Sequence, residues 1–121
     1  MPRTLAIVDR QLGDRCCDRD ARPRIVARDA ERLAEDFQLL GHPVRLQLLD
    51  VLARKAGQVC VCDLEAAVPV KQPTVSHHLR ILREAGVVDG EKVGQWMFYR
   101  VKREALTALR DRIDAQLASL V

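Results

Sequence analysis

Apolar residues recur at every third or fourth position in five stretches of the chain, which is the spacing of helices that bury one face. Gly41 and Pro43 separate the first stretch from the second, and Gly57 closes the second, because glycine and proline commonly end helices. The pattern therefore predicts five helices. They span residues 29–40, 44–54, 62–68, 72–85 and 103–120, and Arg45 of the second helix is expected to face outward.

The third and fourth of these helices are short, and only a Pro-Val-Lys connection separates them. Two short helices joined by a tight turn are typical of a helix-turn-helix, in which the second helix enters the major groove of DNA. On that helix Val75, Leu79 and Leu82 recur on one side, extended by Ala85, and His78 projects towards the same side. We therefore expect this side to face the core and the opposite side to face DNA.

Residues 87–101 predict two short strands around a turn, which lies either at residues 93–94 or at residues 89–90. Trp96 and Phe98 alternate with their neighbours, so one set of side chains packs on the helices, and we expect core aromatics rather than platforms for nucleic-acid bases. A basic hairpin after such a helix is a wing. The sequence thus predicts a mainly α protein with a small β-hairpin (α+β), a homodimeric winged helix-turn-helix.

The chain of 121 residues is long enough for one domain with one core. Residues 1–28 carry seven Arg, four Asp and no apolar period, which predicts a flexible N-terminal arm. Residues 29–121 are the expected DNA-binding and dimerisation domain. The last helix has an apolar stripe that either packs on its own domain or pairs with a second copy. The stripe consists of Leu106, Leu109, Ile113, Leu117 and Leu120.

No apolar run approaches the roughly 20 residues of a membrane helix, and the N-terminus is a poor signal peptide, so we expect a cytoplasmic protein without a membrane partner. The net charge of +3 is too small to identify a nucleic-acid binder by itself. Its distribution is more informative, because residues 71–103 contain seven Lys or Arg against three Asp or Glu. Such a run of charges can be an ordinary solvated face, but around a helix-turn-helix it favours a DNA-binding role.

The exposed side of the fourth helix can donate and accept hydrogen bonds to base edges and phosphates, and the wing adds basic side chains. The candidate DNA-binding residues are Lys71, Gln72, Thr74, Ser76, His77 and Arg80 around the helix, and Lys92 and Arg100 in the wing.

The four cysteines form two groups, Cys16-Cys17 in the arm and Cys60-Val61-Cys62 before the third helix. In a reducing compartment such thiols are ligands or redox centres rather than disulfides. If the helix starts near Cys62, Cys60 is extended and both thiols project to one side, whereas inside a helix they would be about 200° apart. The helix N-terminus is expected to lower the thiol pKa. The alternative is that Cys60 and Cys62 are small buried hydrophobes.

Four segments together resemble the ArsR/SmtB family of metal(loid)-responsive winged helix-turn-helix repressors, in its arsenic-sensing form. They are LLGHPVRLQLL at 39–49, VCVCDL at 59–64, KQPTVSHHLRILREAGVV at 71–88 and VGQWMFYRV at 93–101. The resemblance implies a homodimer built on the first and last helices. It also implies that the protein binds operator DNA without metal and releases it when metal binds.

The resemblance also bears on the ligands. Zinc and nickel or cobalt sensors of the family often use Asp and His on the last helix, which here offers Asp111 and Asp114 but no His. Arsenic-sensing members share the Cys-Val-Cys-Asp-Leu motif, but many have a further Cys where this chain has Glu65. Some relatives recruit an N-terminal cysteine pair, which implies that the arm thiols reach across the dimer. The metal ligands expected on this basis are Cys16, Cys17, Cys60 and Cys62.

These observations predict a homodimeric repressor that leaves double-stranded operator DNA when arsenite, As(III), or antimonite, Sb(III), binds three thiolates. Cadmium, Cd(II), or lead, Pb(II), with four thiolates is the alternative. A thiol-disulfide redox protein is a further alternative, but there is no Cys-X-X-Cys and no base beside a nucleophile. A redox-sensing repressor, with an arm cysteine oxidised against Cys60 or Cys62, is a third. The sequence predicts no enzyme activity and no organic cofactor.

Overall fold

The computed structural model describes residues 20–55 and 57–121. Within them the chain forms five helices and three short strands, as predicted for a mainly α protein with a small sheet. The helices are α1 Ala27–Leu40, α2 Pro43–Arg54, α3 Val61–Ala67, α4 Gln72–Glu84 and α5 Arg103–Ser119. The strands are β1 Val59–Cys60, β2 Val88–Val93 and β3 Trp96–Val101.

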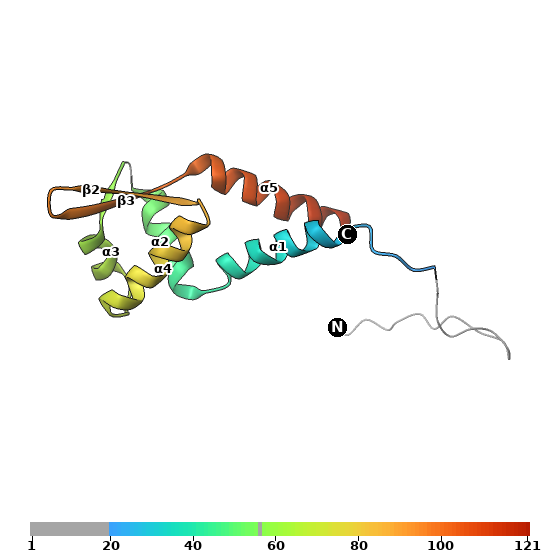
Figure 1. Cartoon of the computed structure of the whole chain (residues 1–121), viewed down its shortest axis with the longest axis horizontal. Helices are drawn as coiled ribbons and strands as arrows, with labels where there is room; N and C mark the ends of the chain where they lie inside the picture. Colours follow the sequence, from blue (N-terminus) through green and yellow to red (C-terminus); the bar gives the residue numbers. More distant parts are fainter. Residues whose placement is uncertain (1–19, 56) are drawn as a thin grey trace.

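The elements form two regions along the length of the molecule (Figure 1). At one end α1 and α5 lie side by side, although they come from opposite ends of the described chain. At the other end α2, α3, α4 and the sheet pack together, and the hairpin of β2 and β3 extends outward. This is the expected winged helix-turn-helix, with a pair of long helices attached to it. None of the helices in the described part of the chain is long and apolar enough to cross a membrane.

The sheet has one strand more than the sequence predicted. Its strand order is β1-β3-β2, and both pairings are antiparallel. β1 consists of only two residues, Val59 opposite Tyr99 and Cys60 opposite Phe98. The hairpin turn lies at Gly94, whose φ of +62° is a conformation that glycine adopts without strain. The turn consists of Gly94 and Gln95, since Val93 still pairs with Trp96, so of the two expected positions the one at residues 93–94 is right to within one residue.

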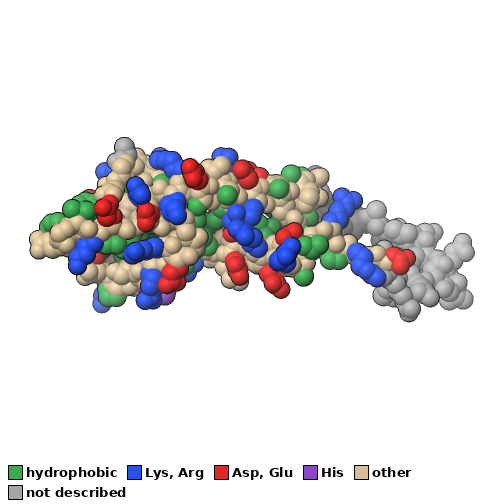
Figure 2. All heavy atoms as spheres, turned by 45° about the horizontal axis from the view of Figure 1, so that its top comes forward, with side chains coloured by type: hydrophobic (Ala, Val, Ile, Leu, Met, Phe, Trp, Pro, Cys, Tyr) green, Lys and Arg blue, Asp and Glu red, His purple; other side chains and the backbone are tan. Residues whose placement is uncertain are grey.

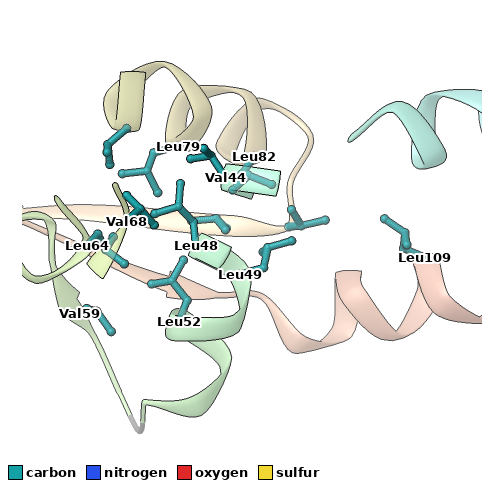
Figure 3. Close-up of a cluster of buried hydrophobic side chains, with 13 residues drawn as sticks. Val44, Leu48, Leu49, Leu52, Val59, Leu64, Val68, Leu79, Leu82 and Leu109 are labelled. Carbon is teal, nitrogen blue, oxygen red and sulfur yellow. The ribbon is translucent and has the colours of Figure 1, made fainter. Parts of the chain in front are cut away.

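The hydrophobic core lies between α2, the helix-turn-helix and the sheet. The inward stripe of α4 is formed as expected, since Val75, Leu79 and Leu82 are fully buried. They meet Leu48 and Leu52 of α2 (Figure 3). Burying a leucine side chain contributes about 1.5–3 kcal/mol, so these contacts stabilise the orientation of α4. The largest fully buried side chains are those of Leu48, Leu52, Leu64, Leu79, Leu82, Val75 and Val88.

α1 and α5 are joined by a partly buried ion pair. Arg112 Nε and Nη2 donate to the two carboxylate oxygens of Asp36, at 2.8 and 2.9 Å. These two hydrogen bonds to Asp36 raise the pKa of Arg112. Because Asp36 is 8% exposed, removing Arg112 would leave a carboxylate buried without a partner.

The apolar stripe of α5 is only partly covered. Leu109 is buried against the domain, whereas Leu117 and Leu120 are 50% and 70% exposed. On the neighbouring helix Phe37 is also exposed, and Val26 is exposed just before α1. A groove of about 660 Å³ runs between the start of α1 and the end of α5, with mostly apolar walls. The start of α5 therefore packs on its own domain, and its end leaves an apolar surface for another partner.

Three side chains differ from the expected pattern. Ala85 is exposed and caps α4 rather than extending its buried stripe. Trp96 is 51% exposed, so of the hairpin aromatics it is Tyr99 that packs against the core. Arg45, which the helical pattern placed outward, is half-buried and makes hydrogen bonds to two other helices.

Candidate thiol site and nucleic-acid interface

Cys60 and Cys62 are brought together where β1 meets α3. Cys60 is the last residue of β1, and Cys62 is the second residue of α3, so the chain changes from extended to helical between them. The Cys62 thiol donates a hydrogen bond to the Cys60 sulfur, with an Sγ–Sγ distance of 2.7 Å. Both are free thiols, and Cys62 is exposed. The prediction that they project to the same side is confirmed, and the buried-hydrophobe alternative does not hold for Cys62.

The protonation of the pair differs from the expectation. The hydrogen bond to Cys60 raises the pKa of the Cys62 thiol, and desolvation and the negative charges of Cys60 and Asp63 act in the same direction. A backbone hydrogen bond at Asp63 lowers it by less. The lowering of the thiol pKa that was expected at a helix start is therefore outweighed by the effect of the second thiol. Because a bound soft ion requires thiolates, binding here must release protons.

The two thiols do not complete a metal site by themselves. Among residues 20–55 and 57–121, no cluster of three or more His, Cys, Asp or Glu side chains could hold a metal ion. Glu65, at the position of the further cysteine of arsenic-sensing relatives, does not join the pair; its Oε1 is buried without a hydrogen-bond partner. The predicted ligands Cys16 and Cys17 lie outside the described residues.

The thiol pair is connected to the wing as well as to the helix-turn-helix. Cys60 pairs with Phe98 in β3, the central strand. Just before β1, the Gln58 amide donates to a carboxylate oxygen of Glu91 in β2, at 2.8 Å. A change in the distance between Cys60 and Cys62 would therefore act on the sheet through β1 and on α3 directly. Sequence reasoning missed this connection, because a two-residue strand has no periodicity of its own.

The predicted DNA-binding face of α4 is exposed. Pro73 occupies the first turn, where its missing N–H costs no helical hydrogen bond. His77 and Arg80 are close to each other on this face, with Nδ1 and Nη2 3.5 Å apart. His78 is 5% exposed on the opposite side, as the sequence predicted. The exposed candidates here are Lys71, Gln72, Thr74, Ser76, His77 and Arg80.

The two candidates in the wing differ from each other. Lys92 is exposed near the end of β2. Arg100 is also exposed, but its Nη2 is 3.0 Å from a carboxylate oxygen of Asp89 on the paired strand. That hydrogen bond lowers the pKa of Asp89. A phosphate would have to compete with Asp89 for Arg100, so Lys92 is the better placed wing contact. On the face shown in Figure 2, Lys and Arg side chains are spread along the molecule rather than gathered in one patch.

Comparison with known proteins identifies the family of this chain. Residues 42–89, from the start of α2 into β2, match the family described as bacterial regulatory protein, arsR family. The HTH-type transcriptional regulator MJ1325 of Methanocaldococcus jannaschii is 39% identical over 84 residues, which are 69% of this chain and 93% of that protein. The chain belongs to the ArsR family. It is a DNA-binding transcriptional repressor of the ArsR/SmtB type and not an enzyme.

Two further members show the range of relatives. The arsenic resistance transcriptional regulator ArsR1 of Pseudomonas putida is 36% identical to this ArsR-family chain over 85 residues, covering 70% of the chain and 62% of the relative. The crystal structure of the AntR antimony-specific transcriptional repressor aligns with a TM-score of 0.61 at 29% identity. The alignment covers 84% of this chain and 91% of that one.

The DNA-binding face predicted for α4 can be tested directly. If His77 and Arg80 contact base edges or phosphates, His77→Ala or Arg80→Ala should each weaken operator binding by about 1–3 kcal/mol. Fluorescence anisotropy with labelled upstream DNA measures the change. Arg54→Ala is the matched control, since Arg54 is an exposed arginine of α2 that pairs with Asp50 in its own helix. Binding by both α4 variants that equals the control would remove α4 from the interface.

Proposed function

We propose that this protein is a cytoplasmic, homodimeric repressor. It dissociates from its operator DNA when trivalent arsenic or antimony binds cysteine thiolates. One observation carries the proposal. The Cys60 and Cys62 sulfurs are 2.7 Å apart, at the junction of the wing sheet and the helix-turn-helix. Two thiols that already touch need little rearrangement to share one ion.

The chemistry of the donors favours a soft ion, because thiolates select thiophilic metals and metalloids. Since the described residues supply only two such donors, the proposal assigns the missing thiolates to Cys16 and Cys17 of the arm. Together with Cys60 and Cys62, one arm thiolate would complete the three thiolates that bind As(III) or Sb(III). Both arm thiolates would give the four that suit Cd(II) or Pb(II), which is the alternative inducer. The names of the relatives ArsR1 and AntR, which refer to arsenic and antimony, support As(III) or Sb(III).

The same geometry supplies a route from ion to DNA. A bound ion would fix the distance between Cys60 at the end of β1 and Cys62 in the first turn of α3. β1 is paired with β3 of the wing, and α3 packs against α4. The ion would therefore bias both DNA-contacting elements at once without touching DNA, which is how a ligand changes affinity at a second site.

A homodimer is part of the proposal. The exposed apolar side chains of α1 and α5 need a partner, and a second copy of the chain offers the same surface. Two copies related by a two-fold axis would place two α4 helices on successive major grooves, about 34 Å apart.

The proposal is tested by anisotropy of the full-length protein on its own upstream DNA, titrated separately with As(III), Sb(III), Cd(II), Pb(II), Zn(II) and hydrogen peroxide. As(III) and Sb(III) should release the DNA at the lowest concentrations, and Zn(II) should not. Release by Cd(II) or Pb(II) at lower concentrations would select the alternative inducer. Release by peroxide alone would indicate a redox sensor, and no release by any of them would refute a thiol-based sensor.

A further inference from the structure

Arg45 connects three helices through one guanidinium group. Its Nη1 donates to the backbone carbonyls of Gln38 and Leu39 in the last turn of α1, at 3.1 and 3.3 Å. Its Nε donates to Nδ1 of His78 in α4, at 3.1 Å. The last carbonyls of a helix have no partner in the helical ladder. The Gln38 carbonyl also accepts the Gly41 N–H at 3.3 Å, so Arg45 adds a second donor there and supplies a donor to Leu39. We call these three hydrogen bonds, made from α2 to α1 and to α4, the Arg45 bridge.

The acceptor on α4 is a buried, neutral histidine. His78 is 5% exposed, and because an arginine N–H can only donate, Nδ1 of His78 must be unprotonated. The His42 ring lies beside it, with centroids 4.2 Å apart. Nδ1 of His42 accepts the Val44 N–H at 3.2 Å and so caps the start of α2. Both rings are therefore used as acceptors, and protonation of His78 would abolish its hydrogen bond from Arg45.

The bridge joins the end of α1 and the start of α2 to α4, and α1 passes into α2 where the two regions of the molecule meet (Figure 1). Arg45 borders a cavity of about 630 Å³ between α1, α4 and α5, which Glu35, Asp36 and Arg112 also line. Asp36 is already paired with Arg112 at 2.8 Å. A guanidinium forms stronger hydrogen bonds than a neutral donor, so Arg45 provides a strong polar connection between the end of α1 and α4.

We propose that Arg45 and His78 are positioning residues for DNA recognition, and that the Arg45 bridge fixes the orientation of α4 relative to α1 and α5. The inference rests on the proposed function, in which α4 enters the operator and α1 and α5 form the dimer. In such a dimer the two α4 helices must meet successive major grooves together. A small rotation of α4 against α1 therefore weakens both half-site contacts.

The charges around His78 give the bridge a pH dependence of definite sign. Burial lowers the pKa of His78, and His42 and Arg45 of α2 and His77 of α4 lower it further. The neutral ring, and with it the bridge, is intact above the ordinary histidine pKa of about 6.5. It is lost as the pH falls through the lowered pKa.

The test compares the operator affinities of full-length variants by anisotropy, with dimer mass and thermal unfolding recorded in parallel. Arg45→Ala should weaken binding by roughly tenfold or more, the effect of losing charge-assisted hydrogen bonds. Arg45→Lys should recover only part of it, because an ammonium cannot reproduce the planar fork. Arg54→Ala, on the same helix but exposed and outside the bridge, should bind like the wild type.

A pH series separates positioning from general stability. Wild-type affinity should fall below about pH 6.5. His78→Gln should bind well at neutral pH and lose this acid decrease, because an amide oxygen accepts from Arg45 but does not titrate. An unchanged acid decrease in His78→Gln, or an affinity of Arg45→Ala equal to that of Arg54→Ala, would overturn the inference. If Arg45→Ala does not fold, the His78→Gln profile decides.

Failure of the bridge and failure of the proposed function give different results. A wild-type protein that does not bind the upstream DNA refutes the proposed function. A wild type that binds and releases with As(III), while Arg45→Ala binds like Arg54→Ala and His78→Gln keeps the acid decrease, refutes only the bridge.

Discussion

Cys62→Ser is expected to bind the operator with wild-type affinity and to keep it bound at As(III) concentrations that release the wild type. The serine hydroxyl preserves the size of the side chain, but it is a hard donor and does not replace a thiolate for a soft ion. Allosteric coupling commonly changes affinity by about 5–150-fold, and this whole factor should disappear. Cys60→Ser should behave in the same way, because the two sulfurs are in contact at 2.7 Å.

Anisotropy titrations at a fixed DNA concentration measure this loss. Asp63→Asn is the control, since Asp63 is exposed next to Cys62 and its replacement leaves both thiols in place. It should release the DNA with As(III). Cys16→Ser combined with Cys17→Ser tests the arm, and an unchanged response would mean that the arm pair is incidental. Normal release by both the Cys60 and the Cys62 variants would place the sensing site elsewhere in the chain.

Leu117→Glu is expected to separate the dimer into monomers and to lower operator affinity by about 10²–10⁴-fold, the loss that follows when two linked contacts become single ones. Leu117 is 50% exposed on α5, within the stretch that leaves an apolar surface uncovered. A carboxylate introduced on this surface would lose its hydration in a closed interface, which is costly for a charge without a partner.

Sedimentation equilibrium gives the mass, and anisotropy gives the affinity. Leu46→Glu is the matched control, because Leu46 is 52% exposed but lies on α2, away from the α1 and α5 pair. It should remain dimeric. A Leu117→Glu protein that is still dimeric, or a wild type that is monomeric at micromolar concentration, would contradict the assigned dimer surface.

Helical periodicity was sufficient to predict the helices. α1 begins at Ala27, two residues before the expected start, and α2 begins at Pro43, one residue early. Side-chain direction on α4 was also predictable, because Val75, Leu79 and Leu82 recur at helical spacing. These features depend on local sequence, so a single sequence contains them.

Features that depend on distant residues were not predictable. β1 exists only because Cys60 pairs with Phe98, which lies far along the chain. Arg45 was expected to point outward, since nothing nearby in the sequence shows that His78 and the end of α1 are close enough to accept its hydrogen bonds. In the site, motif spacing predicted that Cys60 and Cys62 project to the same side. It did not predict the raised pKa of the Cys62 thiol, which arises from the contact between the two sulfurs.

The most direct test of thiol-controlled repression is to follow thiol protection and DNA release in one titration. As(III) is added to the operator complex, and at each step anisotropy is read and free thiols are alkylated and located by mass spectrometry. The account predicts that Cys60, Cys62 and at least one of Cys16 and Cys17 become protected over the As(III) range in which the DNA is released. Release while Cys60 and Cys62 remain open to alkylation would contradict it.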